Sequence, residues 1–246
     1  MSTLEIHGTH IPYRVVKSKG RSISLRFSLR EPLLEIRTPT GRFSRHERLA
    51  IRQHEAWILK HYAQRQHLWQ RREAFIDGLE QGKGLYLGQP IEIRVSDSER
   101  AQVHIDEEAG LLHLSLSPAW RAQPLAMALY QGLRSIAKHE LKRRVYVQAQ
   151  RTNLHVNQVR VKDVTSRWGS CSEKHNVNLN WHLILLKPDL IDYLIIHELM
   201  HLHEMNHSPR FWQWVGRYFP DYERAERELT EAEWLIGIFD QWIGQA

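Results

Sequence analysis

The residues best suited to perform chemistry lie in the segment Ile195-Ile196-His197-Glu198-Leu199-Met200-His201, which contains the pattern His-Glu-x-x-His. On a helix, residues four positions apart lie on one face, so the imidazoles of His197 and His201 can point at one cation. Zinc suits such a pair because it accepts imidazole nitrogens and prefers four ligands. Glu198 would then lie beside the open coordination position, where a carboxylate can accept a proton from water and deliver it to a leaving group. The segment therefore predicts a catalytic zinc site with Glu198 as the general base.

The third ligand that we expect is His207, six residues beyond the second histidine and at the offset known from the metzincin pattern. That pattern bends the chain at a glycine, whereas Glu204 occupies the corresponding position here. We expect Met205-Asn206 to form the turn instead, because asparagine tolerates the left-handed backbone conformation. Ser208 and Pro209 fit the N-cap and the first residue of a following helix, which would hold His207 in place.

Different ligand sets, and a pattern that arose by chance, are also compatible with the sequence. His203 is two residues from His201 and so lies on another helix face. A carboxylate of the last helix is the alternative third ligand, and the candidates are Glu223, Glu226 and Glu231. A chance pair of histidines is a further possibility in a chain with 16 of them. A structural metal site would normally fill all four positions with protein ligands and would leave Glu198 without a role.

The helix that carries the pattern has clear sequence signals. Pro188 fits its first position, and Asp189 and Asp192 complement the positive end of the helix dipole. Its apolar residues occur on nearly all sides, which predicts a buried helix; these are Leu190, Ile191, Leu194, Ile195, Ile196 and Leu199. A buried helix should not hold two histidines and a glutamate without partners, and this supports a functional site.

Two groups of short strands precede this region. The first group is expected near residues 4–7, 13–16, 22–27 and 33–36, and the second near 85–87, 91–95, 103–105 and 111–116. A long basic helix is expected from Ser44 to about Ile76, and another from about Leu125 to Arg151. Strands near residues 159–161 and 177–181 and three helices, beginning near Pro188, Pro209 and Asp221, follow. The pattern predicts an α+β fold with a division near residue 120, and no repeat of a usual solenoid period is found.

Composition limits the classes of function. The chain has 246 residues, of which 42% are hydrophobic and 25% charged, as is ordinary for a folded protein. Its net charge of +6 and pI of about 9.5 favour acidic partners such as nucleic acid, nucleotides or an acidic polypeptide, although a solvated basic surface is equally compatible. Neither a membrane span nor a signal-peptide core is apparent, and Cys171 is the single cysteine. Cytoplasm is the expected location.

Several separated blocks resemble the YgjP-like metallopeptidase family, which is related to SprT-like and other small zincin proteases. The blocks are Arg167-Trp168-Gly169-Ser170-Cys171, Asn178-Leu179-Asn180-Trp181, Asp192-Tyr193, His197-Glu198-Leu199-Met200-His201 and Asn206-His207-Ser208-Pro209-Arg210-Phe211-Trp212. The resemblance implies zinc on His197, His201 and His207, with Glu198 as the catalytic base on a buried helix. It further implies a zincin-like metallohydrolase domain at residues 121–246, after a β-rich region with one long basic helix at residues 1–120.

Three functions are compatible with these features. The first is a zinc metallopeptidase, in which the strand at residues 177–181 could pair with an extended peptide and Arg167 could contact an anion. The second is a metal-dependent nucleoside triphosphate pyrophosphatase or other phosphoanhydride hydrolase, since Arg and His hold phosphate oxygens well. The third is a nucleic-acid-associated binding protein that uses the basic helix from Ser44 to Ile76. The sequence does not specify the substrate, the oxyanion-stabilising residue or the oligomeric state.

Overall fold

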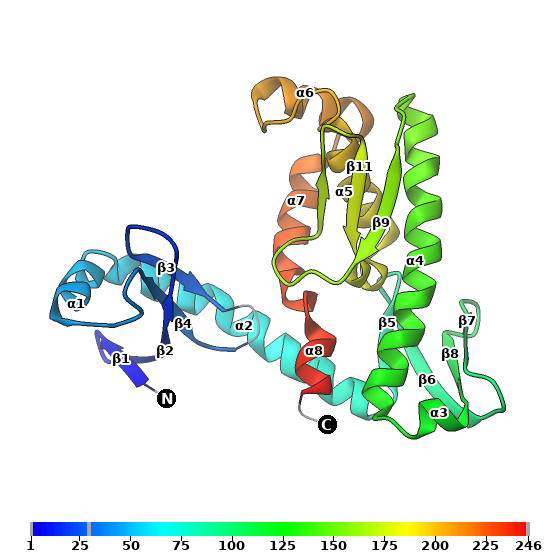
Figure 1. The fold of residues 1–246 in the computed structure, drawn as a ribbon, viewed down its shortest axis with the longest axis horizontal. Helices are drawn as coiled ribbons and strands as arrows, with labels where there is room; N and C mark the ends of the chain where they lie inside the picture. Colours follow the sequence, from blue (N-terminus) through cyan, green and yellow to red (C-terminus); the bar gives the residue numbers. More distant parts are fainter. Residues whose placement is uncertain (1, 29–30, 245–246) are drawn as a thin grey trace. The chain divides into compact units, whose positions relative to one another are not determined.

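The chain folds into two compact units, residues Met1–Ala74 and Phe75–Ala246. The computed structural model describes residues 2–28 and 31–244, with the side chains of residues 46, 47 and 50 left undescribed. Sheets and helices alternate through both units, so the fold class is α+β (Figure 1). The boundary between these two units does not coincide with the predicted domain boundary near residue 120. The predicted boundary stays a prediction. None of the described helices is long and apolar enough to cross a membrane.

The first unit is a small sheet covered by helices. Its strands are β1 (Ser2–Ile6), β2 (Thr9–Lys17), β3 (Ser24–Phe27) and β4 (Leu34–Thr38), in the order β1-β2-β4-β3. The β2–β4 pair is parallel and the two outer pairs are antiparallel. Alternate strand residues such as Ile11, Leu34 and Ile36 are buried in one cluster with Ile58 and Trp69 of the covering helix. The four predicted strands of this part are therefore confirmed.

The long basic helix predicted from Ser44 is in fact two helices, α1 (Arg45–Arg52) and α2 (Glu55–Glu80). The chain turns between them, and both Ile51 of α1 and Trp69 of α2 belong to the same core cluster. In one straight helix these two residues would lie about 27 Å apart. A sheet of four strands is only about 14 Å wide. The break thus allows α1 to fold back onto the sheet that α2 covers.

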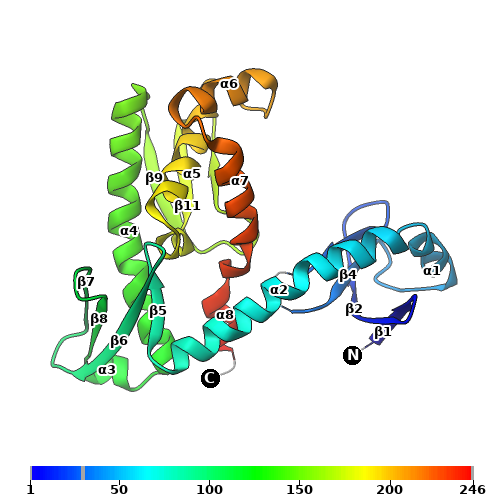
Figure 2. The same ribbon diagram turned by 180° about the vertical axis from the view of Figure 1, so that it is seen from behind.

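The second unit begins with another sheet of the same design. Its strands are β5 (Lys83–Tyr86), β6 (Gln89–Asp97), β7 (Gln102–Asp106) and β8 (Leu111–Leu116), in the order β5-β6-β8-β7. Again the central pair is parallel and the outer pairs are antiparallel. A short helix α3 (Pro118–Arg121) and the long helix α4 (Leu125–Thr152) follow, and α4 contacts β7 and β8 (Figure 2). The strands and the helix predicted here are confirmed.

The two sheets are copies of one module, named here the first copy (residues 2–80) and the second copy (residues 83–152). Strand order and pairing directions are identical, and the first hairpin of each copy turns on residues with positive φ, His7-Gly8 and Leu87-Gly88. Such pairs form the two-residue turns that match the twist of a hairpin. Equivalent positions also pair in the same register, since Leu25 faces Ile36 as Val103 faces Leu114.

The rest of the second unit builds a layer around one central helix. The strands β9 (Gln158–Lys162), β10 (Gly169–Cys171) and β11 (Asn176–Asn180) form a sheet in the order β10-β11-β9. A 3-10 turn η1 (Trp181–Leu185) leads to α5 (Pro188–Met200), and α6 (Pro209–Tyr218), α7 (Tyr222–Glu231), η2 (Glu233–Leu235) and α8 (Ile238–Ile243) follow. Helix α5 contacts α4, α6, α7 and β10, so it lies at the centre of this layer (Figure 1).

The hairpin turn of the second copy supports the start of α5. The backbone N–H of Leu87 donates to the carbonyl of Ile184, 2.8 Å away. A Cβ placed on Gly88, whose φ is +75°, would lie only 2.9 Å from the backbone nitrogen and Cα of Lys187, the N-cap residue of α5. The equivalent Gly8 has a φ of +78°, and no atom of the described residues lies within 4 Å of such a Cβ.

This difference between the two turns predicts unequal effects of the same substitution. Gly8→Ala is expected to cost about 1 kcal/mol, the strain of a left-handed alanine. Gly88→Ala is expected to cost at least about 1 kcal/mol more, because backbone atoms must also move apart. Urea denaturation of both variants checks this, and equal losses of stability would contradict the close packing of the Gly88 turn on α5.

Candidate metal centre

The histidine pattern lies at the end of α5. Pro188 is the first residue of the helix, as predicted, and nine of its 13 residues are buried. Glu198 is 5% exposed, and His201 is the C-cap residue, 9% exposed. Because α5 is packed on several sides, the side chains of His197, Glu198 and His201 cannot all point into solvent. Their polar atoms must find partners within the protein or in a bound ligand.

Three imidazoles converge at this helix end. One ring nitrogen from each of His197, His201 and His207 lies within 4.8 Å of the others. The Nε2 atoms of His197 and His207 are 3.1 Å apart. Two nitrogens that share a tetrahedral zinc ion at about 2.0–2.1 Å lie about 3.3–3.4 Å apart. The spacing therefore fits a common cation, and the three residues could hold one.

The protonation of these rings also suits metal binding. A carbonyl oxygen only accepts hydrogen bonds, so His201 donates from Nδ1 to the carbonyl of Glu204 at 3.1 Å, which leaves its Nε2 lone pair free for a metal. Burial, together with the neighbouring His201 and His207, lowers the pKa of His197 to about 3. His197 is accordingly neutral near pH 7, and only a neutral imidazole can be a ligand.

The chain returns to the cluster through a bend at Met205 and Asn206. Asn206 does not take the left-handed conformation that we predicted, since it is not among the described residues with positive φ. Its side chain stabilises the bend instead: Oδ1 accepts from the backbone N–H of Ser208 at 2.9 Å, and Nδ2 donates to Glu204 at 2.7 Å. Local side-chain bonds of this kind replace the need for an unusual backbone angle. Ser208 caps α6 and Pro209 opens it, as predicted.

Phe211 is the residue around which the three rings pack. Its ring is fully buried and lies 4.6–4.9 Å from each imidazole centroid. The sequence suggested only ordinary core packing for this position. Its place four residues after His207, in the first turn of α6, was the one signal of a closer role. By packing against all three rings, Phe211 restricts their rotation and holds them ready for a common ligand.

Glu198 lies against the short strand β10 rather than among the three imidazoles. It accepts a hydrogen bond from the backbone N–H of Cys171, and a Cβ on Gly169 would be 2.6 Å from its Oε1. Its Oε2 is buried and has no hydrogen-bond partner among the residues that the structure describes. A buried, unpaired carboxylate oxygen is costly unless something polar is bound beside it. This oxygen is therefore available to a water molecule or substrate at the site.

The environment of Glu198 sets its proton affinity. Burial raises the pKa of Glu198 to about 8, and the nearby Arg167 guanidinium opposes the rise. A cation held by the three histidines would favour the ionised carboxylate further, because opposite charges attract. Arg167 itself is exposed. Because Arg167 lies near Glu198, the anion contact that we predicted for Arg167 would act beside this carboxylate.

Asn180 fixes the loop that leads into β10. It is 1% exposed, and its Nδ2 donates to the carbonyls of Val164 and Arg167 at 2.7 and 3.0 Å. Its backbone N–H donates to the carbonyl of Trp168 at 2.7 Å. One asparagine thus supports the segment that contacts Glu198. In the sequence this residue stands out only as a member of a family block, and nothing there indicates its role.

The other ligand candidates lie elsewhere. The ring of His203 stacks on that of Trp214 at 4.1 Å, outside the cluster. None of the carboxylates at positions 223, 226 and 231 joins the three histidines in the described part of the chain. The cluster consists of the same three histidines that the spacing pointed to, while their role as ligands stays a proposal.

Comparison with known proteins identifies the family. The model of the YgjP-like metallopeptidase domain matches residues 21–232, which is most of the chain. The chain belongs to the YgjP-like metallopeptidase family. The match includes all the residues described at the metal centre, so the cluster of this YgjP-like protein lies within the family's domain.

Two solved structures resemble part of this YgjP-like chain. The crystal structure of the metallopeptidase zymogen of Pyrococcus abyssi abylysin matches with 22% identity and a TM-score of 0.34, over 37% of this chain and 91% of that one. The zymogen of Methanocaldococcus jannaschii jannalysin matches with 21% identity and a TM-score of 0.35, over 37% and 95%. A search of curated proteins found no match.

The contact between Gly169 and Glu198 leads to a prediction. Gly169→Ala is expected to displace the Glu198 carboxylate and lower hydrolytic activity by about 10- to 100-fold, since small misplacements of catalytic groups are costly. The metal content should not change. Gly216→Ala is a matched control, because its Cβ would meet Tyr222 at an acceptable 3.4 Å. Activity assays and metal analysis of both variants check this, and full activity of Gly169→Ala would contradict the contact.

Proposed function

We propose that this chain is a zinc-dependent metallopeptidase, with His197, His201 and His207 as the metal ligands and Glu198 as the general base. The observation that supports this most directly is the approach of the ring nitrogens to within 4.8 Å of one another, on a scaffold of the metallopeptidase family. Three imidazoles are a common ligand set for zinc and leave a fourth position open. A metal held there supplies Lewis-acid activation of water and of the scissile carbonyl.

The remaining roles in hydrolysis are carried out by the protein's own groups. Glu198 accepts the proton of the attacking water and passes it to the departing amine, for which its unpaired Oε2 is available. The backbone N–H of Cys171 orients the carboxylate. Arg167 places positive charge next to Glu198, where it can assist an anionic part of the substrate. All three roles are performed by Glu198 or by groups next to it.

The strand at residues 177–181, which we expected to pair with a peptide, is the central strand β11 and is paired on both sides. A peptide substrate is instead supported by the position of β10. This strand forms the edge of its sheet, and it contains Gly169 and Cys171, which both contact Glu198. The unpaired side of an edge strand can bind an extended peptide through main-chain hydrogen bonds. A peptide bound in this way would pass directly by the general base. We therefore place the substrate backbone alongside β10, as an additional strand of its sheet.

A cytoplasmic location is part of the same proposal. Cys171 is the single cysteine and cannot form an internal disulfide. Burial and the charge of Glu198 raise the pKa of its thiol to about 11, so the thiol stays protonated. Such a cysteine serves as a small packed side chain and has no evident redox role.

The proposal is tested by the class of bond that the zinc-loaded protein cleaves. Purified full-length protein is incubated with an unstructured protein such as casein, with a mixture of peptides and with a panel of nucleoside triphosphates. Peptide cleavage that is lost with a chelator and restored by zinc is the expected result. Phosphate or pyrophosphate release without peptide cleavage would overturn the proposal in favour of phosphoanhydride hydrolysis.

A further inference from the structure

A cavity opens in the first copy, far in sequence from the histidine cluster. It has a volume of about 390 Å³ and is lined by Ile23 and Leu25 at the edge strand β3, by Ile51 of α1, and by His54 and Trp57 at the start of α2. Leu25 belongs to β3, which pairs with β4 on one side only. The side chain of Trp57 remains 40% exposed, unusual for so large an apolar group. The cavity is thus apolar inside and open to solvent.

The second copy is closely packed at the equivalent strand. Val103 of β7 takes the register position of Leu25, and a Cβ on Gly132 of α4 would lie 3.2 Å from the Cβ of Val103. Helix α4 therefore packs directly on β7. In the first copy the cavity lies at this point, with Ile23 and Leu25 on one side and Ile51 and Trp57 on the other. In the second copy, which has the same fold, this space is filled by the contact between α4 and β7. The cavity is therefore a feature of the first copy and does not follow from the fold.

Charge distinguishes the copies in the same direction. The first copy, residues 2–80, contains 15 Lys and Arg against 8 Asp and Glu, whereas the second copy, residues 83–152, contains 10 against 7. The rest of the chain beyond residue 74 has 19 against 22 in total. The excess positive charge of the protein thus comes entirely from the first unit. Such an uneven distribution indicates an acidic partner of that unit.

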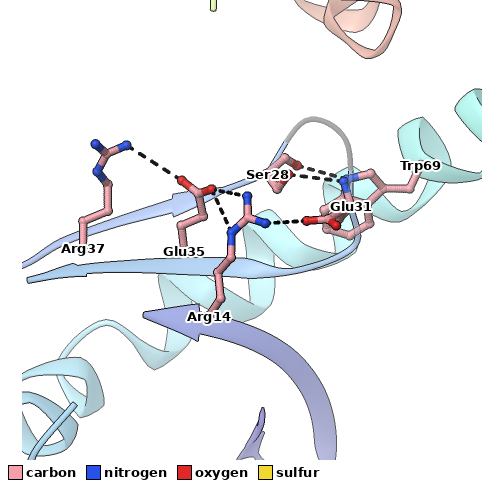
Figure 3. A network of polar contacts seen from close by, with 6 residues as sticks. All are labelled: Arg14, Ser28, Glu31, Glu35, Arg37 and Trp69. Carbon is pink, nitrogen blue, oxygen red and sulfur yellow. Dashed lines mark hydrogen bonds and ion pairs between the residues drawn. The ribbon is translucent and has the colours of Figure 1, made fainter. Parts of the chain in front are cut away.

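The acidic residues of this unit are partly engaged away from the cavity. Arg14 contacts both Glu31 at 2.7 Å and Glu35 at 2.6 Å, and Arg37 approaches Glu35 at 3.8 Å (Figure 3). Exposed arginines occur next to the cavity-lining positions in the chain; they are Arg21, Arg48 and Arg52. None of these three has a carboxylate partner among the described side chains. They remain available to neutralise charges on a ligand.

The shape and charge of the site together select the ligand. Trp57 stacks on Phe27 at 6.0 Å and contacts His61 at 4.4 Å, so its ring is held in place while part of it faces solvent. A fixed aromatic ring in an apolar cavity takes a flat group, and the guanidinium groups of residues next to the lining positions in the chain can take phosphates. We propose that this cavity binds single-stranded nucleic acid, with one base inserted beside Trp57 and the flanking phosphates on the arginines.

An acidic peptide fits these observations less well. It could pair with the free edge of β3, but that strand has only four residues and carries an exposed Arg26. Short, charged edge strands are typical of edges that avoid added strands. Duplex nucleic acid is also disfavoured, because its stacked and paired bases cannot enter a cavity. Binding at this site does not depend on the proposed peptidase activity.

The test uses full-length protein and fluorescein-labelled 20-mers of deoxythymidine and of uridine, with fluorescence anisotropy at several salt concentrations. A 20-mer with abasic sites throughout presents the same phosphates without bases. The 20-mers with bases are expected to bind at least about tenfold more tightly than the abasic one. A difference between the DNA and RNA strands would show which of the two the site prefers. Equal binding of the abasic chain, or of a 20-residue glutamate peptide, would overturn the proposal.

Substitutions at the cavity test whether the nucleic acid binds there. Trp57→Ala is expected to weaken binding of the strands with bases by about tenfold and to leave the abasic chain unaffected. Arg52→Ala should weaken all of them and lower the salt dependence, by about 0.7 in the log–log slope. Tyr146→Ala and Arg100→Ala are the matched controls, since both residues are exposed in the second copy. If Trp57→Ala binds like the wild type, the proposal is wrong.

A measurement on the unmodified protein covers the case in which Trp57→Ala does not fold. An oligonucleotide that carries 5-iodouracil is cross-linked to the wild-type chain by light, and the attached peptide is identified by mass spectrometry. The expected site of attachment is the segment from Gln53 to Leu59, which contains Trp57. Cross-links confined to residues beyond 74 would exclude the cavity as the binding site.

Discussion

Replacing Glu198 with Gln is expected to lower peptide hydrolysis by about 10²- to 10⁴-fold, the usual contribution of a general base. Glutamine has nearly the same shape, so it can still lie against Gly169 and β10. It cannot accept the proton of the attacking water. Because Glu198 is not one of the three clustered histidines, the zinc content should equal that of the wild type.

The measurement is kcat for a peptide substrate, together with metal analysis of the same samples. Glu223→Gln is a suitable control, since that carboxylate is exposed on α7 and lies outside the cluster. Wild-type activity of Glu198→Gln would rule out Glu198 as the base. Loss of zinc in this variant would instead indicate that Glu198 is itself a metal ligand.

The second large effect concerns the metal. His207→Ala is expected to weaken zinc binding by more than about 100-fold, because it removes one of the three proposed ligands, and even a supporting partner of a ligand contributes up to that amount. His207 is exposed at the start of α6, so its loss should disturb the fold little. The variant should also lose peptide hydrolysis, which needs the metal.

Chelator competition at equal protein concentrations measures this effect. His203→Ala is the matched control: it also removes an exposed histidine of the same segment, but its ring stacks on Trp214. Equal zinc affinity of His207→Ala and the wild type would discredit His207 as a ligand. A carboxylate such as Glu223, Glu226 or Glu231 would then return as the third candidate.

Sequence patterns predicted the local elements of this site well. Proline and serine mark the starts of α5 and α6 because their effects on the backbone act within a few residues. The spacing of the histidines predicted a cluster, since helix geometry alone places His197 near His201. The bend before His207 was placed at the right residues, although Asn206 forms it through side-chain bonds and not through its backbone angle.

Features that depend on distant parts of the chain were not predictable in this way. The contact of Glu198 with Gly169 joins residues 29 positions apart and follows from how α5 packs on β10. Phe211 was recognisable as apolar, but its contact with three imidazoles is a property of the folded chain. The duplicated sheet also escaped notice, since matching positions such as Gly8 and Gly88 are 80 residues apart and few residues are shared.

The contact between the second copy and α5 has a consequence for how the chain tolerates change. The hairpin turn of the second copy supports the helix that carries the histidines. All the residues that we describe around those histidines come from positions after 74. A change in the turn of the second copy would displace this helix as well, so we expect that turn to vary less among relatives than the first hairpin turn, where a Cβ on Gly8 has no described atom within 4 Å.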